Sequence, residues 1–105
     1  MILLKVIGLP KLTKFKKKHP QAREPIAAWL EEAKNASWKN MNDVWERYPN
    51  ASQISKSDFI IFDIKGNSFR LAVRAMFRQG ILMIDEVYTH AEYDKKNFEG
   101  KNNGY

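Results

Sequence analysis

The chain has 105 residues, 44% of them hydrophobic and 12% aromatic, and this content predicts one folded domain, residues 1–105, rather than a disordered chain. It contains no cysteine, which excludes disulfides and thiolate metal sites. The net charge is +6, and the excess lies at one end, because the first 23 residues hold seven basic groups and no acidic one. Such a concentration is typical of a protein that binds a polyanion, most often nucleic acid, although a solvated helix face or a surface for an acidic protein would show the same pattern.

The N-terminal segment 2–7 is apolar and predicts the first strand. It lacks the leading positive charge of a signal peptide, and no apolar run in the chain is long enough to span a membrane. We therefore expect a cytoplasmic protein.

The next segment predicts a short, amphipathic and strongly basic helix. Leu9, Leu12 and Phe15 recur at helical spacing, and His19-Pro20 ends the pattern. We expect His19 to be an exposed loop residue without a catalytic role. The polar positions of the helix carry four lysines that we select as a patch for RNA: Lys14, Lys16, Lys17 and Lys18.

Two further helices are predicted before residue 50. The first begins between residues 20 and 25, and we expect its Trp29 to be part of the core rather than of a ligand site. A turn over residues 35–40 follows, and Asn40 is a good N-cap for the next, shorter helix, with Asp43 in its first turn.

The second half of the chain changes to a strand-like pattern. Strands are predicted over residues 59–64, 69–77 and 81–89, with a hairpin turn at residues 65–68. One strand, three helices and a three-stranded antiparallel meander together indicate an α+β fold. We expect the tail, residues 99–105, to fray.

The middle strand of the meander carries two arginines on one face. Arg70 and Arg74 share this non-core face and lie about 13 Å apart at the usual strand rise, too far to clamp one phosphate but suited to successive phosphates of an RNA backbone. Acidic residues on neighbouring strands are the alternative partners, and Arg70 has no obvious one in the sequence. We expect this face of the sheet to be open.

The segment after the last strand, Thr89-His90-Ala91-Glu92-Tyr93-Asp94-Lys95-Lys96, gathers an imidazole, a phenol, carboxylates and ammonium groups. Few of these groups can be buried without partners, so most face water or a ligand. His90 and Tyr93 beside cations suit proton transfer next to a phosphate, whereas a polar C-terminal tail with a chance histidine is the simpler interpretation.

No metal site or cofactor motif is predicted. His19 and His90 are far apart in the sequence, and the chain has neither a glycine-rich phosphate loop nor a nucleophile elbow. A nuclease of this kind would be metal-independent and would use the ribose 2′-OH as the nucleophile. That reaction needs a base, cations for the phosphate and an acid for the 5′-oxygen, and it cannot cut DNA, which lacks the 2′-OH.

Several segments resemble the HigB branch of the RelE-like toxins, in the same order along the chain. Three carry the resemblance: Ala36-Ser37-Trp38-Lys39-Asn40, Gly66-Asn67-Ser68-Phe69-Arg70-Leu71 and Thr89-His90-Ala91-Glu92-Tyr93-Asp94. The helix ends at His19-Pro20 and Tyr48-Pro49 are similar to the family as well. The resemblance covers residues 2–98, and the last two motifs are fairly specific when both occur.

The resemblance implies a RelE-like fold and the toxin of a type II toxin–antitoxin module, which cleaves mRNA on translating ribosomes and is silenced by a helix-turn-helix antitoxin of the HigA type. It implies that Arg70 contacts the scissile phosphate and that His90 and Tyr93 serve in acid–base chemistry. Many RelE-like proteins have an arginine where this chain has His90, which leaves the base and the acid unassigned. The RNA-binding set then comprises Lys14, Lys16, Lys17, Lys18, Lys65, Asn67, Arg74 and Lys95.

The residues and the resemblance together favour a ribosome-associated endoribonuclease toxin that inhibits translation. Two alternatives stay open: a non-catalytic RNA-binding or regulatory module, and a toxin of the same fold that poisons DNA gyrase. His90 and Tyr93 beside arginines favour the nuclease, because a gyrase poison needs no such set.

Overall fold

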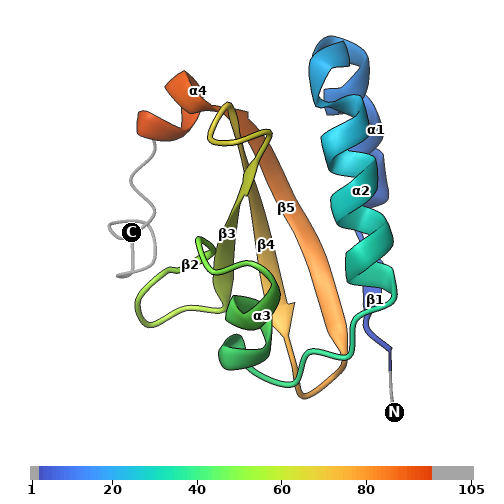
Figure 1. Ribbon diagram of the computed structural model, residues 1–105, viewed down its shortest axis with the longest axis vertical. Coiled ribbons are helices and arrows are strands. Elements are labelled where there is room, and N and C mark those ends of the chain that lie inside the picture. The colour runs from blue at the N-terminus through green and yellow to red at the C-terminus, as the bar shows by residue number, and fades with distance from the viewer. Residues whose placement is uncertain (1–2, 96–105) are drawn as a thin grey trace.

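A five-stranded mixed sheet forms the centre of the structure, a computed structural model that describes residues 3–95 (Figure 1). The strand order is β1-β5-β4-β3-β2, in which β1 runs parallel to β5 and all other neighbours are antiparallel. The strands are β1 (Lys5–Ile7), β2 (Ser52–Gln53), β3 (Phe59–Ile64), β4 (Phe69–Met76) and β5 (Ile81–Thr89). Sheet and helices together confirm the α+β fold.

The helices gather mainly on one side of this sheet. Helix α1 packs against β5, and α2 packs against α1 and β1, so that the two long helices lie side by side in Figure 1. The helical elements are α1 (Leu9–Lys18), the 3-10 turn η1 (Pro20–Ala22), α2 (Arg23–Lys34), α3 (Met41–Arg47) and α4 (His90–Asp94). None of the helices in the described part of the chain is long and apolar enough to cross a membrane.

The main core lies between the sheet and the first three helices. Trp29 of α2 is 2% exposed, and its ring meets that of Phe62 of β3 edge-on at 5.2 Å, which confirms the predicted core role of Trp29. Leu71 and Val73 of β4 are fully buried on the same side. Burial of each large apolar side chain stabilises the fold by about 1.5–3 kcal/mol. Since side chains alternate along a strand, the burial of Leu71 and Val73 places Arg70 and Arg74 on the opposite face of the sheet.

We had expected the opposite face of the sheet to be open, but the structure shows that it is partly covered. A second, smaller apolar cluster covers part of it: Ile54, Phe59, Ile61, Ala72 and Tyr88, with Tyr93 packed against them. The segment between α3 and β3 supplies Ile54, and α4 supplies Tyr93. The arginines of β4 therefore lie beside an apolar cluster rather than on bare sheet.

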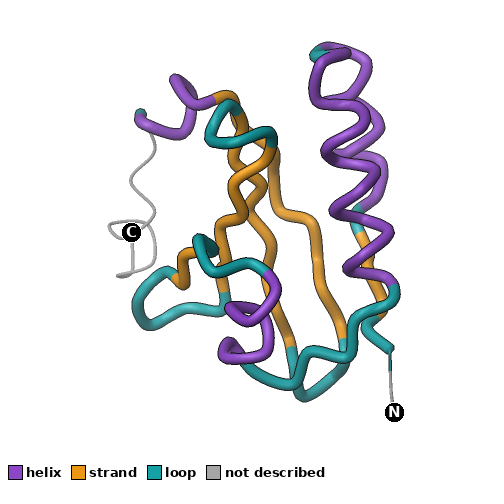
Figure 2. The backbone as a smooth tube through the Cα atoms, in the orientation of Figure 1, coloured by secondary structure: helices purple, strands orange, loops and turns teal. Residues whose placement is uncertain are grey.

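Two strand pairings and one helix differ from the prediction. β1 begins at Lys5 and joins the meander as a parallel edge strand, while the short β2 extends the other edge. The pairing of β1 with β5 is long-range, and β2 has only two residues, so neither pairing leaves a clear pattern in the sequence. The chain then passes from β5 directly into α4, where we had expected only the end of a strand (Figure 2). Residue 2 of the predicted first strand and the tail 99–105 lie outside the described residues.

Gly8 sets the path from β1 into α1. Its φ of +85° lies in the left-handed region, and a Cβ at this position would come within 2.9 Å of the backbone oxygen of Ile84. Glycine is thus required for α1 to fold back onto β5. At the other end of α1, His19 lies in the loop before η1, as predicted, but it is half-buried with its ring 4.4 Å from that of Phe15, so the prediction that it is exposed is wrong.

Candidate functional site

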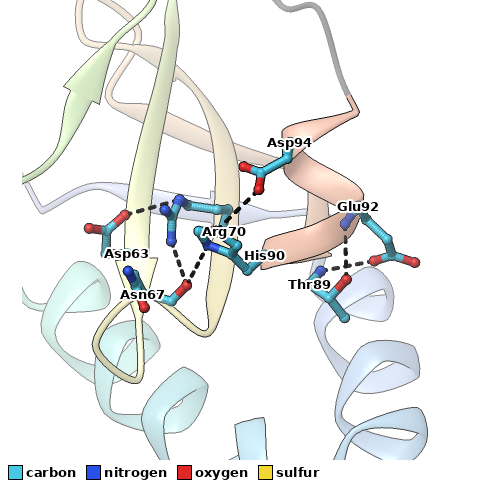
Figure 3. Close-up of polar contacts among 7 residues, drawn as sticks. All are labelled: Asp63, Asn67, Arg70, Thr89, His90, Glu92 and Asp94. Atoms are coloured by element: carbon cyan, nitrogen blue, oxygen red, sulfur yellow. Dashed lines mark hydrogen bonds and ion pairs between the residues drawn. The ribbon is translucent and has the colours of Figure 1, made fainter.

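The predicted chemical residues meet where the β3–β4 hairpin touches α4 (Figure 3). The hairpin turn needs left-handed backbone at Lys65 (φ 54°) and Gly66 (φ 64°), which directs the following Asn67 carbonyl toward α4. The backbone N–H of His90 donates to the Ser68 carbonyl at 3.0 Å. A backbone hydrogen bond therefore joins the hairpin to the helix, independently of their side chains.

Helix α4 is held at its start by a reciprocal cap. The Thr89 hydroxyl accepts from the Glu92 backbone N–H at 3.1 Å, and the Glu92 carboxylate accepts from the Thr89 backbone N–H at 2.9 Å. The hydrogen bond from the Thr89 backbone lowers the pKa of Glu92, and its neighbours Lys18 and His19 lower this pKa further. The ionised Glu92 cap therefore stabilises the folded protein at a pH above the ordinary glutamate pKa, and this stabilisation is lost as the pH falls through the lowered pKa of Glu92.

Arg70 is the cation at the centre of this arrangement, and its side chain is 15% exposed. Its Nη1 donates to the Asn67 carbonyl at 2.7 Å, and its Nε lies 3.4 Å from Oδ1 of Asp63, the residue directly opposite on β3. The guanidinium also lies 5.5 Å from the centre of the Tyr93 ring. Arg70 therefore has an acidic neighbour, and our prediction that it lacked one was wrong.

His90 occupies the first position of α4, with its side chain 49% exposed. Its Nδ1 lies 3.2 Å from the Asn67 carbonyl, the same oxygen that Arg70 contacts, and its Nε2 lies 3.1 Å from Oδ2 of Asp94. A single backbone oxygen thus ties the arginine of β4 to the histidine of α4. We call Asn67, Arg70, His90 and Tyr93 the hairpin–helix site.

Tyr88 is a further member of this region that the sequence analysis missed. It lies opposite Arg70 on β5, and its ring is 6.2 Å from that of Tyr93. Burial raises the pKa of Tyr88 to about 12, with the carboxylates Asp85 and Glu86 adding to the effect, so this phenol stays protonated at neutral pH. Simple alternation along β5 would put Tyr88 on the face of Leu82 and Ile84, but the register shift beside Ala72 and Val73 moves it to the opposite face, so the sequence pattern did not reveal it.

A groove of about 440 Å³ runs between α1 and β5, and we call it the α1–β5 groove. Its basic wall is α1, from which Lys11 donates to the Asp85 carbonyl at 2.6 Å. Its end nearest α4 carries Glu92. The lining residues are Lys11, Lys14, Phe15, Lys18, Glu86, Val87, Tyr88 and Glu92.

The structure divides the predicted RNA-binding residues into three groups. Lys14 and Lys18 line the groove, whereas Lys17 is exposed on another part of α1 and Lys16 is half-buried. The side chain of Asn67, whose carbonyl belongs to the hairpin–helix site, is exposed, and the exposed side chains of Lys65 and Lys95 flank the site on the turn and at the end of α4. Arg74 lies farther along β4 with its guanidinium 4.9 Å from the centre of the Phe59 ring, outside the site.

The hairpin–helix site combines groups that suit chemistry on a phosphodiester. A guanidinium presents a planar fork of N–H donors that matches phosphate oxygens, and an imidazole can transfer a proton near neutral pH. Within residues 3–95, no cluster of three or more His, Asp or Glu side chains is arranged to hold a metal ion.

Comparison with known protein families gives a match over most of the chain. A family model described as HigB toxin, the RelE-like toxic component of a toxin–antitoxin system, matches residues 22–96, which are 75 of the 105 residues of the chain. The matched region contains the whole hairpin–helix site but only the last part of the basic N-terminal segment. No curated protein matches the sequence.

Proposed function

The chain belongs to the HigB toxin family, the RelE-like toxic components of toxin–antitoxin systems, and we propose that it is an endoribonuclease that cleaves mRNA on the ribosome and so inhibits translation. Membership of this family implies an antitoxin as a partner, and we propose one of the HigA type. We further propose that residues 1–105 form one toxin domain that acts in the cytoplasm, where translating ribosomes are found.

One observation carries this proposal: the Asn67 carbonyl holds the Arg70 guanidinium and the His90 imidazole at one point of the surface. A phosphate placed against Arg70 would lie next to the histidine. Among the described contacts, two of the five N–H donors of Arg70 have partners, which leaves donors for phosphate oxygens.

The proposed reaction is attack of a ribose 2′-OH on the adjacent phosphorus, with loss of the 5′-oxygen. Arg70 neutralises the charge that develops on the phosphate, and His90 serves in proton transfer. Tyr93 packs against the guanidinium and contributes a ring on which a base can stack. The lysines of the α1–β5 groove and those flanking the site hold the RNA backbone without reading its sequence.

Controlled expression in bacteria tests the proposal. Induction should stop growth and produce new mRNA ends within coding regions, and co-expression of the cognate antitoxin should restore growth. Normal growth with a verified amount of soluble protein would contradict the toxin function. Growth arrest with intact mRNA would favour a non-catalytic RNA-binding module, and arrest with DNA damage would favour a gyrase poison.

The lysines of α1 give a separate prediction for ribosome binding. Replacing Lys14, Lys17 and Lys18 by glutamine should weaken binding and lower the slope of log affinity against log salt by roughly 0.7 to 0.9 for each phosphate that the protein no longer neutralises. These side chains are exposed, so folding should be unaffected. Filter binding at several salt concentrations measures the slope.

A triple variant with the same charge change provides the control. Lys34, Lys39 and Lys56 are exposed and lie outside the groove and the hairpin–helix site, and their replacement by glutamine should leave the slope unchanged. Equal slopes for the two triple variants would show that α1 does not hold RNA.

A further inference from the structure

Both ring nitrogens of His90 face oxygen atoms that can only accept hydrogen bonds. Nδ1 faces the Asn67 carbonyl at 3.2 Å, and Nε2 faces the Asp94 carboxylate at 3.1 Å. A neutral imidazole carries one proton and could donate only one of these bonds, whereas an imidazolium donates both. The surroundings therefore match the charged form of the ring.

The contact at Nδ1 is the more rigid of the two. The Asn67 carbonyl belongs to the hairpin turn and also accepts from Arg70 at 2.7 Å, and the His90 backbone is bonded to the same turn through Ser68. A proton on Nδ1 is thus fixed by backbone geometry. The other nitrogen, Nε2, is left as the position at which a proton is gained or lost.

The contact at Nε2 is the more easily exchanged. Asp94 stands four residues after His90 at the end of the five-residue helix α4, and its side chain is 59% exposed. An ion pair so exposed to water is weak, and a substrate oxygen can replace it. Until that exchange takes place, the Asp94 carboxylate is the acceptor for a proton on Nε2.

The charged groups around His90 come from β3, β4 and α4. Arg70 of β4 is the cation next to His90, and Asp63 of β3 lies beside its Nε. On α4 itself, Glu92 is turned to the Thr89 cap, and Tyr93 lies against the Arg70 guanidinium. Arg70 and His90 therefore each face a carboxylate of their own, Asp63 and Asp94 respectively.

We propose that Asp94 is a positioning residue that keeps Nε2 of His90 protonated, and that His90 is the acid that donates this proton to the leaving 5′-oxygen. The inference rests on the proposed function. The 2′-oxygen forms a bond to phosphorus and its proton passes to solvent. The bond from phosphorus to the 5′-oxygen breaks, its electron pair stays on that oxygen, and the Nε2 proton neutralises it. The ring is left neutral, with its Nδ1 proton still on the Asn67 carbonyl.

A sulfur substitution in the substrate tests the role of His90. The cleavage position is first mapped with the wild-type protein, and mRNA with sulfur in place of the 5′-oxygen at that position is then compared with normal mRNA on programmed ribosomes. A thiolate leaves without a proton, so an acid is not needed for it. His90→Gln should lower the single-turnover rate on normal mRNA by about 10² to 10⁴, but by less than about tenfold on the sulfur substrate.

The pH dependence of the rate tests the role of Asp94. Asp94→Asn removes the charge that favours the proton on Nε2, so its rate on normal mRNA should fall by about 3- to 10-fold at pH 8 and recover as the pH is lowered toward 6. The sulfur substrate should remove this difference. Glu46→Gln, a change of an exposed carboxylate on α3, is the matched control and should follow the wild-type profile.

The outcomes separate this inference from the proposed function. Equal losses for His90→Gln on the two substrates would show that His90 is not the acid. Identical pH profiles for Asp94→Asn and the wild type would show that Asp94 does not position it. Both results leave the nuclease function standing, whereas a wild-type protein that cuts neither substrate would overturn the function and the inference together.

Discussion

Replacing Arg70 by alanine should abolish toxicity while the protein still folds. Loss of one group that stabilises charge on a reacting oxygen typically lowers a rate by about 10² to 10³, and Arg70 is the most buried cation of the hairpin–helix site. Colony formation on inducing medium and single-turnover cleavage on programmed ribosomes measure the effect. Arg70→Lys should recover little, because an ammonium group cannot present the planar fork that matches phosphate oxygens.

Arg78→Ala is the matched control for this change. It removes the same charge from a residue in the turn at the far end of β4, and the variant should stay toxic. The thermal midpoint should move little in Arg70→Ala, since Asp63 is one-third exposed and can turn to water when Arg70 is removed. Full toxicity of Arg70→Ala would show that the phosphate does not lie at this site.

Replacing one ribose by deoxyribose should have the largest effect of all. If the 2′-OH next to the scissile phosphate is the nucleophile, a single 2′-deoxy nucleotide at that position removes the attacking atom, and cleavage there should fall below detection. Binding to the ribosome should be unaffected, because the phosphates are unchanged. Primer extension across the mapped position measures the cut.

A deoxy nucleotide placed two positions downstream is the control and should leave cleavage intact. Cutting at the deoxy position itself would require another nucleophile, such as water, and would exclude the mechanism we propose while leaving the toxin family unaffected.

Local patterns predicted the separate elements well. The bounds of β3 and β5 agree with the apolar runs, and the Asn40 side chain accepts from the Asp43 backbone as its N-cap position predicts. Helix α4 was missed, although the Thr89-x-x-Glu92 spacing is the signature of the capping box that the structure contains. The apolar strand before it and the shortness of the helix hid this signal.

Register explains the error at Arg70. The hairpin turn pairs Ile64 with Phe69, and counting outward from that pair puts Asp63 opposite Arg70. Asp63 could therefore have been identified from the sequence as the partner of Arg70, but only if the length of the hairpin turn, which fixes the register of the two strands, had been known. His19 shows the other kind of limit, because its ring packs against Phe15 and Phe69, and the contact with Phe69 depends on how α1 lies against the sheet.

The feature that unites the site has no sequence signal of its own. Arg70, His90 and Tyr93 were selected from the sequence, but the atom that joins the first two is the backbone carbonyl of Asn67, which every residue type possesses. Its direction comes from the left-handed backbone at Lys65 and Gly66. Asn67 was selected for RNA binding, whereas its contact with the two catalytic candidates runs through the backbone.

The chemistry of the fragment ends tests the central claim most directly. Purified protein is incubated with ribosomes programmed with a defined mRNA, and the two ends at each cut are identified by end-labelling and mass spectrometry. The proposed mechanism predicts a 2′,3′-cyclic phosphate or a 3′-phosphate on the upstream fragment and a 5′-hydroxyl on the downstream one. Intact mRNA, or a 5′-phosphate opposite a free 3′-hydroxyl, would contradict it.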